Sequence, residues 1–381
     1  MLIDRRIFNH FNYKLLLATL FICAAGLVVL YSAGFDPNST SRNLGIFGYA
    51  PKSVPFTKQA MFMGVGLIFM LVGMVVNSQS LYRVAYPFYI ACILMLIGVL
   101  LFGTVVNGSR RWFPIGDFRF QPSEIAKVAV ILVMARYLSR TRLPLGGFTL
   151  KSIIIPTLLM LLPMSLIIRQ PDLGTALSLG SAGFGMLFFV GIRPRTLVSL
   201  AILGAIAVVP VWNSLHDYQK RRVWTLIDPT SDPLGSGYHL NQSKIAVGSG
   251  AFAGKGYFQG TQAQLEFLPE HTTDFVFSVL AEEWGFLGSV IVLGLYFFFM
   301  VSLLSIISKS RDIFASFIVV GVSSLFFFHI IVNIGMVIGI LPVVGITLPL
   351  FSYGGSSVLV SMFCIGIVLG ISMRKYQFGR T

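Results

Sequence analysis

Long apolar runs of about 20 residues, separated by short polar breaks, constrain the fold of this 381-residue chain more than any other feature. A helix of that length satisfies its backbone hydrogen bonds internally, which membrane hydrocarbon requires. A β-barrel would alternate apolar and polar positions, and these runs do not. Only 11% of the residues are charged, whereas a soluble domain carries roughly a quarter. We therefore predict an all-α integral membrane protein.

About ten spans are expected within one membrane domain, residues 1–381. They are Leu15–Ala33, Ala60–Val76, Ala85–Phe102, Ile125–Leu138, Ile153–Ile168, Thr175–Val190, Thr196–Val211, Gly285–Ile307, Ile313–Ile334 and Ser357–Met373. The apolar stretch Ile340–Ser357, before the last span, contains two prolines and three glycines. Because these residues interrupt a helix, we predict a broken or re-entrant segment there.

Basic residues in the short loops predict the orientation of the chain. The loops on the side of the termini carry about twice as many Lys and Arg residues as the opposite loops, which places both termini in the cytoplasm of a bacterium. The protein is then expected in the cytoplasmic (inner) membrane, with the long polar loop 213–273 between spans seven and eight outside. The net charge of +14 is read as topology signals and contacts with anionic lipids, not as a nucleic-acid surface.

The long polar loop ends at Asp274, directly where the next apolar run begins. A carboxylate at the rim of a membrane, beside aromatic residues and facing a basic loop, is the leading candidate for chemistry. The chain has no P-loop, no dinucleotide-binding glycine motif, no HExxH and no GxSxG nucleophile elbow. An external reaction must therefore consume an activated substrate or be hydrolytic.

Two charged residues fall at the start of the fourth span, Glu124 and Lys127, three positions apart on one helix face. Charges within spans are costly and point to function by default, but a structural ion pair between helices is an equal alternative. Asp172, followed by Gly174 and Thr175, is read either as a helix N-cap or as a substrate ligand.

Arg110 and Arg111 lie beside Trp112 on the outer side. They are interpreted either as membrane anchors or as ligands of a pyrophosphate, because a guanidinium group binds phosphate oxygens in pairs. The run from Lys220 to Pro229 predicts an amphipathic helix on the membrane surface.

The glycine-rich stretch 235–260 contains Lys244 and Lys255 and suits close approach to an anionic or sugar ligand; a plain flexible loop is the alternative. Glu282, near the start of the eighth span, is expected to orient the surroundings of Asp274 or to bind a cation. His329, among phenylalanines in the ninth span, is expected to be a hydrogen-bonded core histidine.

Eight short segments, taken together and in order, resemble the SEDS family (shape, elongation, division and sporulation proteins) over nearly the whole chain. The segments are Asn107–Phe113, Phe120–Lys127, Gln170–Thr175, Arg222–Pro229, Gly237–Ser243, Leu268–Glu270, Thr273–Phe275 and Ser352–Ser357. Each motif alone is weak, whereas the ordered set is specific. The short N-terminus is more similar to the elongation-type branch than to the division-type branch.

The resemblance implies a peptidoglycan glycosyltransferase that polymerises lipid II beside a class B penicillin-binding protein and other membrane proteins of the elongation complex. It implies that Asp274 is the essential carboxylate and general base, with Arg110, Arg111, Lys127 and the loop lysines near the phosphates. A divalent cation, magnesium or manganese, is left open. The family usually reads Pro-Glu-x-His-Thr-Asp, and here His271 stands one position early, which leaves its role undefined.

Two alternatives from other classes stay open at this point. A lipid II flippase would use Glu124, Lys127 and the broken segment near Pro342–Pro349 as its pathway. A non-catalytic scaffold would only activate its partner, and the chemistry would then not depend on Asp274.

Overall fold

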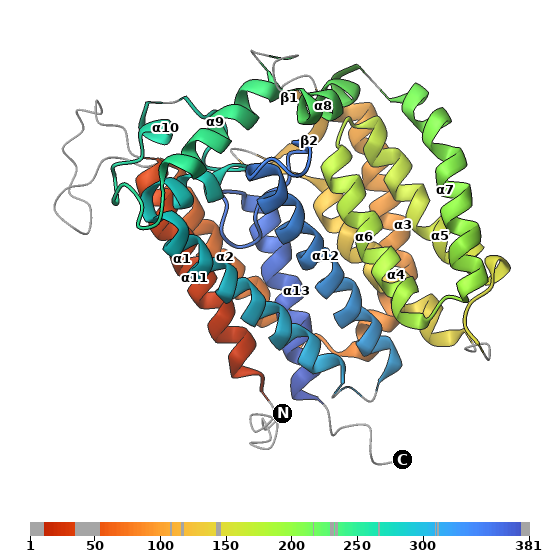
Figure 1. Cartoon of the computed structure of the whole chain (residues 1–381). Coiled ribbons are helices and arrows are strands. Elements are labelled where there is room, and N and C mark those ends of the chain that lie inside the picture. Colours follow the sequence, from red (N-terminus) through yellow and green to blue (C-terminus); the bar gives the residue numbers. More distant parts are fainter. Residues whose placement is uncertain are drawn as a thin grey trace.

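Every predicted span coincides with a helix of the computed structural model (Figure 1). The structure describes residues 11–34, 54–106, 109–115, 118–141, 146–215, 217–228, 232, 235–265, 267–308, 310 and 312–374. The helices that match the spans are α1 (Tyr13–Ala33), α2 (Val54–Val75), α3 (Ser78–Phe102), α4 (Pro122–Arg140), α5 (Leu150–Arg169), α6 (Leu173–Val190), α7 (Pro194–Ser214), α11 (Val276–Ile307), α12 (Ile313–Val337) and α13 (Gly355–Met373).

Within the described residues, eight of these helices are long and apolar enough to cross a membrane; α4 and α7 are the other two. Helix α4 is less apolar because it is the interior helix of the bundle, and 14 of its 19 residues are buried. It contacts α3, α5, α6, α12 and α13. Its polar groups therefore face protein and not lipid, which is where intramembrane charges are tolerated. Helix α7 stands at the edge of the bundle (Figure 1).

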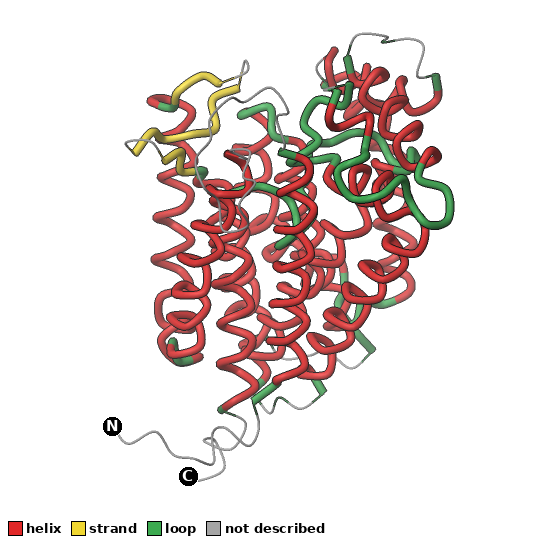
Figure 2. Tube along the Cα trace, turned by 90° about the vertical axis from the view of Figure 1, so that its left-hand side faces the viewer, coloured by secondary structure: helices red, strands yellow, loops and turns green. Residues whose placement is uncertain are grey.

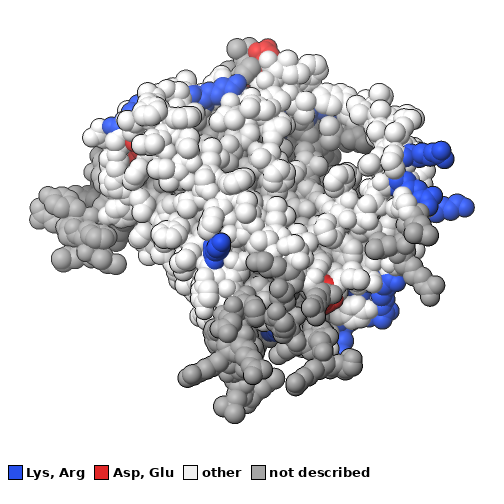
Figure 3. All heavy atoms as spheres, turned by 60° about the horizontal axis from the view of Figure 1, so that its bottom comes forward, with Lys and Arg blue, Asp and Glu red and all other residues white. Residues whose placement is uncertain are grey.

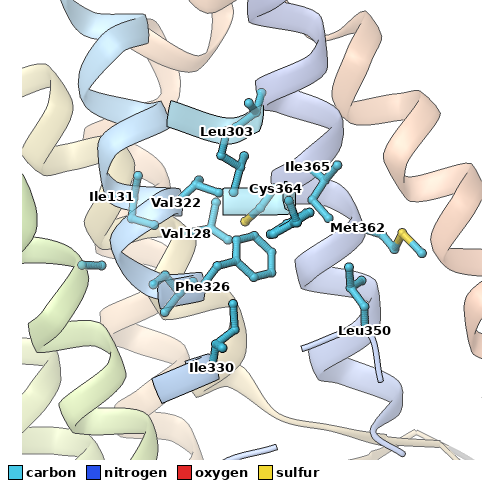
Figure 4. Close-up of a cluster of buried hydrophobic side chains, with 14 of the residues drawn as sticks. Val128, Ile131, Leu303, Val322, Phe326, Ile330, Leu350, Met362, Cys364 and Ile365 are labelled. Atoms are coloured by element: carbon cyan, nitrogen blue, oxygen red, sulfur yellow. The ribbon is translucent and has the colours of Figure 1, made fainter. Parts of the chain in front are cut away.

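The apolar core lies between α4, α11, α12 and α13 (Figure 4). Val128 and Ile131 of α4 meet Val322 and Phe326 of α12 in the cluster drawn there, and all four are at most 4% exposed. Tight packing of this kind fixes the positions of α12 and α13, from which the site is built.

Helices α2 and α13 pack backbone against backbone. A Cβ atom at Gly366 would overlap the Met70 carbonyl oxygen, and one at Gly370 would lie 2.6 Å from the Met74 carbonyl oxygen. Small residues allow this close approach where no hydrophobic force drives helices together in lipid.

The polar elements gather at one end of the bundle, which we call the loop end (residues 104–120 and 217–275; Figure 2). A three-stranded antiparallel sheet, β1 (Thr104–Val106), β2 (Ser109–Ile115) and β3 (Phe118–Phe120), adds strands to the predicted helices. Three more helices follow: α8 (Asp217–Ile227), α9 (Ser236–Ser249) and α10 (Thr261–Gln264). Helix α8 confirms the predicted helix around residue 220; Pro229 lies outside the described residues.

The glycine-rich stretch 235–260 is not a flexible loop throughout, because its first half forms α9. Leu240, Ser243 and Ala246 of α9 are at most 1% exposed and pack toward α11. Ser243 Oγ lies 2.8 Å from Ser278 Oγ and donates to the Val337 carbonyl at 2.7 Å. Docking on α11 and α12 therefore outweighs the low helix propensity of its glycines.

The broken segment before the last helix is confirmed, since residues 338–354 have no regular structure yet are largely buried. Polar side chains of neighbouring helices hold its backbone: Tyr296 Oη donates to the Pro349 carbonyl at 2.7 Å, and Gln59 Nε2 to the Ser352 carbonyl at 2.9 Å. Irregular backbone is tolerated at this depth because protein groups satisfy it.

Helix α11 is interrupted at Gly285, whose φ of 64° and ψ of −158° only glycine adopts readily. The loop 251–256 supplies the missing hydrogen bonds. Lys255 N and Gly256 N donate to the carbonyls of Glu282 and Glu283, each at 3.0 Å. On the other side of the break, the amides of residues 286 and 287 donate to the carbonyls of residues 251 and 252. The loop is thereby joined to the helix on both sides of the break.

Helix α1 begins, and α13 ends, at the end of the bundle opposite to the loop end (Figure 1). Lys and Arg side chains are scattered over this face, with few acidic side chains among them (Figure 3). The distribution agrees with the loop charges used to predict the orientation.

Candidate active site

Asp274 lies in the turn that leads into α11. The turn closes on Glu270, whose φ of 56° is a backbone conformation that favours glycine and whose carbonyl accepts from Thr273 N and Phe275 N. Phe275, 2% exposed, anchors the turn in the core. Such strain persists only where the surroundings hold it, and it concentrates at functional sites.

Four charged groups surround the half-buried Asp274 carboxyl, and they come from different elements: Glu270 of the same turn, Arg222 of α8, Asp172 before α6 and Arg111 of β2. The pKa of Asp274 is raised to about 7, mainly by burial and also by the negative charges of Glu270 and Asp172, while Arg222 and Arg111 oppose the rise. A carboxyl group with a pKa near 7 can accept a proton and release it again at neutral pH.

The irregular segment 338–354 forms one wall of this site. A Cβ atom at Gly345 would lie 3.5 Å from Asp274 Oδ2, so the backbone of this glycine lies close beside the carboxylate. Tyr353 N donates to the Thr272 carbonyl at 2.9 Å, and Asn333 Nδ2 to the Asp274 carbonyl at 2.8 Å. The turn is thus held by this segment and by α12.

Asp172 is the N-cap of α6, since its Oδ1 accepts from Thr175 N at 3.2 Å. Its second oxygen accepts from Gln121 Nε2 at 3.0 Å, and Arg111 Nη1 lies 3.9 Å away. Arg111 also donates to the Gln170 carbonyl at 3.0 Å and to the Pro171 carbonyl. The capping interpretation is confirmed, and the same carboxylate faces Asp274.

Glu124 and Lys127 form a buried ion pair, with Lys127 Nζ 2.9 Å from Glu124 Oε1. Glu124 Oε2 has no partner among the described residues. Glu124 and Gln121 line an apolar pocket of about 260 Å³ between α2, α3, α4 and α13, whose other walls are mainly aromatic and aliphatic, such as Phe69 and Phe363. Gln121 connects this pocket to Asp172, and Asp172 faces Asp274.

Lys255 and Glu282 pair with each other at 2.6 Å. Glu282 is fully buried and also accepts from Thr261 Oγ1, Thr261 N and Gln262 N. These contacts fix the start of α10 to α11. The geometry therefore assigns this pair a supporting position in the loop end.

Lys255→Met is expected to destabilise the protein by about 1–3 kcal/mol, because a buried carboxylate loses its charged donor. The KM for substrate is expected to stay within twofold of native. Thermal unfolding of the purified protein and steady-state kinetics measure the two quantities. A tenfold rise in KM at unchanged stability would instead place Lys255 on the substrate.

Two of the predicted basic ligands, Arg110 and Lys244, have exposed side chains at the loop end. Arg110 is paired through its backbone with Val105 in the sheet, and its side chain has no hydrogen-bond or ion-pair partner among the described residues. Lys244 of α9 covers Gly339, which follows the C-terminus of α12, and a Cβ atom at Gly339 would displace it. A cation at that position also complements the negative end of the helix dipole.

Both histidines in question are engaged with backbone carbonyls. His271 Nδ1 lies 2.8 Å from the Leu268 carbonyl and its Nε2 lies 3.0 Å from the Ala33 carbonyl, so it links the turn to α1. His329 Nδ1 lies 3.3 Å from the Thr347 carbonyl, in agreement with the predicted core role.

The sequence leaves open whether the protein binds a divalent cation. Within the part of the chain described, no group of three or more His, Cys, Asp and Glu side chains could hold one.

Sequence reasoning missed Gln121, Arg222, Glu270 and Asn333 as members of the site. Arg222 and Glu270 lie within the segments that resemble the family, which was a usable signal. Asn333 was detectable only as one amide in an apolar run.

Ten bundle helices, and a half-buried carboxylate connected through Asp172 and Gln121 to an apolar pocket, define a polytopic membrane protein whose site has both polar and apolar surroundings. The chain belongs to the family of FtsW, RodA and SpoVE, described as cell cycle proteins, whose sequence pattern matches residues 13–377.

One relative is the peptidoglycan glycosyltransferase MrdB of Escherichia coli K12, 41% identical over 98% of this chain and 96% of that protein. A solved chain from a peptidoglycan synthase complex that coordinates polymerisation and crosslinking superposes with a TM-score of 0.80 at 33% identity, covering 96% of this chain and 99% of that one. The Thermus thermophilus rod shape determining protein RodA gives 0.69 at 30%, covering 96% and 98%.

Proposed function

We propose that this chain polymerises lipid II into glycan strands at the loop end, with Asp274 as the general base. Family membership and the identity to MrdB make it a peptidoglycan glycosyltransferase of the RodA type. The observation that supports the role of Asp274 is its position. It is the carboxylate that faces Arg111, Asp172, Arg222 and Glu270 together, and its pKa is raised to about 7.

The reaction joins the 4-hydroxyl of an acceptor sugar to the anomeric carbon of a donor. Asp274 takes the hydroxyl proton as the new C–O bond forms, and the bond from the anomeric carbon to the lipid pyrophosphate breaks. The electron pair of that bond leaves with the pyrophosphate. Attack opposite the leaving group inverts the anomeric centre and gives a β-linkage from an α-pyrophosphate.

The apolar pocket accommodates the lipid part of the substrate, and the charged groups around Asp274 accommodate its headgroup. The polyprenyl chain suits the pocket lined by Phe69 and Phe363, and the headgroup reaches past Gln121 toward Asp274. The pyrophosphate gains negative charge as it leaves, so cations stabilise the transition state. Exposed Arg110 and Lys244 are the proposed phosphate ligands. Arg111 and Asp172 shape the site, and the Glu124–Lys127 pair borders the lipid.

The proposed setting is the bacterial cytoplasmic membrane, with the loop end outside and both termini in the cytoplasm. A class B penicillin-binding protein is the proposed partner, because the similar solved chain comes from a peptidoglycan synthase complex. The elongation complex is the proposed assembly, since MrdB and RodA are among the similar proteins.

The purified chain with its cognate penicillin-binding protein tests this function when it is supplied with labelled lipid II already accessible to the loop end. Glycan polymer that depends on Asp274 supports the enzyme. Lipid II that crosses a vesicle membrane without polymerisation supports the flippase. Equal polymer from native protein and from an Asp274 variant moves the chemistry to the partner and supports the scaffold.

The polymerisation rate is expected to follow the ionisation of Asp274. A general base acts when deprotonated, so kcat/KM should be half-maximal near pH 7 and fall about tenfold per pH unit below pH 6. Glu270→Gln removes a neighbouring negative charge, lowers the pKa of Asp274 and should move this acid limb to lower pH. Arg222→Gln should move it to higher pH. Rate profiles from pH 5 to 9 measure the limb, and identical profiles for all three proteins would contradict the assignment.

A further inference from the structure

Asn333 is an amide inside the long apolar helix α12 and is fully buried. Burying an amide without hydrogen bonds is costly, so a polar residue at this position needs partners. Its partners are not in its own helix. Both belong to segments that form the active site.

The two hydrogens of the Asn333 amide are both used. Nδ2 donates to the Asp274 carbonyl at 2.8 Å and to the Ile346 carbonyl at 2.7 Å. The reverse orientation would place the amide oxygen against two carbonyl oxygens, so the donor assignment is unambiguous. The Oδ1 atom itself has no partner within the described part of the chain.

These two hydrogen bonds tie the turn that carries Asp274 to the wall formed by the irregular segment, beside the hydrogen bond from Tyr353 N to the Thr272 carbonyl. Gly345 directly precedes Ile346 and lies against Asp274, since a Cβ atom on it would be in van der Waals contact with Oδ2 at 3.5 Å. Of the three hydrogen bonds, the two from Asn333 act directly on the backbone of Asp274 and of the residue after Gly345, so the position of the carboxylate against Gly345 depends on this side chain.

We infer that Asn333 is a positioning residue, which sets the position of the Asp274 carboxylate relative to the wall at Gly345 so that the acceptor hydroxyl meets the base at hydrogen-bonding distance. This role rests on the proposed function of Asp274. Asn333 itself does not touch the substrate. Its effect is on the geometry of the reacting groups, where a misplacement of about 1 Å can lower a rate about 100-fold.

His329 provides a matched control, because it lies one helical turn from Asn333 on α12 and binds the same irregular segment. Its Nδ1 contacts the Thr347 carbonyl at 3.3 Å. Within the described part of the chain it makes no hydrogen bond to the Asp274 turn, so its loss loosens the wall without releasing the turn.

The test compares native protein, Asn333→Leu, Asn333→Asp and His329→Leu as full chains in complex with the cognate penicillin-binding protein. Both Asn333 variants approximately keep the side-chain shape; leucine removes both donors and aspartic acid removes at least one of them. The second variant is used if the first does not fold. Polymerisation kinetics with labelled lipid II and thermal unfolding are measured for each. We expect kcat to fall about 100-fold in the Asn333 variants, with KM within twofold of native, and about twofold or less in His329→Leu.

A native kcat in folded Asn333 variants would overturn the inference, as would equal losses in the Asn333 and His329 variants, which would indicate general anchoring of the wall. Asp274→Asn in the same assay distinguishes failure of the proposed function from failure of the positioning role alone. If that variant polymerises normally, the proposed function of Asp274 fails and the positioning role fails with it. If that variant is inactive while Asn333→Leu is native-like, only the positioning role fails.

Discussion

Asp274→Asn is expected to lower glycan polymerisation by about 1,000-fold or more while the protein remains folded. General-base catalysis contributes about 100- to 10,000-fold, and an amide keeps the shape of the carboxyl group but cannot accept the proton. The measurement is polymer formed from labelled lipid II by the purified complex, with the penicillin-binding protein present in both arms. Binding of lipid II should be retained, since the amide occupies the same space.

Stability gives this prediction an independent check. The pKa of Asp274 is raised in the folded protein, so its contribution to stability is fully present below the unfolded value near 4 and is lost as the pH rises through about 7. The asparagine variant carries no such charge, so at pH 8 it should unfold at the same temperature as native protein or a higher one. A variant that is inactive because it is misfolded would unfold lower, and active variant protein would end the assignment.

Gly285→Ala is expected to destabilise the protein by about 3 kcal/mol or more and to abolish polymerisation. The backbone angles at Gly285 are confined to glycine, which costs a substituted residue about 1–3 kcal/mol. The added Cβ atom would also overlap the backbone of Gly254, a further overpacking cost of about 1–3 kcal/mol. Thermal unfolding in detergent and protease cleavage within residues 250–256 measure the loss of the joint between loop and helix.

Gly294→Ala is the control for that experiment. Gly294 lies in the same helix, and a Cβ atom there meets nothing within 4 Å. The alanine should leave polymerisation within twofold of native and leave stability unchanged or raise it by up to about 1 kcal/mol, since alanine favours the helix more than glycine does. Similar losses of stability and polymerisation from both substitutions would show that the break at Gly285 does not require glycine.

The membrane architecture was predictable because each apolar run of about 20 residues predicts a helix surrounded by lipid or protein. The broken segment was predictable because Pro342, Pro349 and Gly345 cannot continue a helix within an apolar stretch. Asp172 was predictable as an N-cap from the residues that follow it. The position of Asp274 at the start of a span also followed from sequence, although the charges around it did not.

The remaining features depend on contacts between distant segments. Helix α9 forms from glycine-rich sequence because Ser243 and Ala246 dock on the helices beneath it. Lys255 and Glu282 were expected near substrate, and their pairing is a property of the folded loop. Asn333 could not be recognised by a search for ionisable groups within spans, since an amide carries no charge.

The interruption of α11 has a consequence for the order in which the protein assembles. The part after Gly285 contains no charged residue and enters the membrane as an ordinary span. The part before it, Val276–Trp284, contains Glu282 and Glu283 and completes its hydrogen bonds only when residues 251–256 dock against it. Asp274 lies two residues before that part, so the turn that carries it is followed directly by a segment whose hydrogen bonds depend on the docked loop. Insertion of the apolar part alone therefore does not complete the site, which also requires residues 251–256 to fold against the helix.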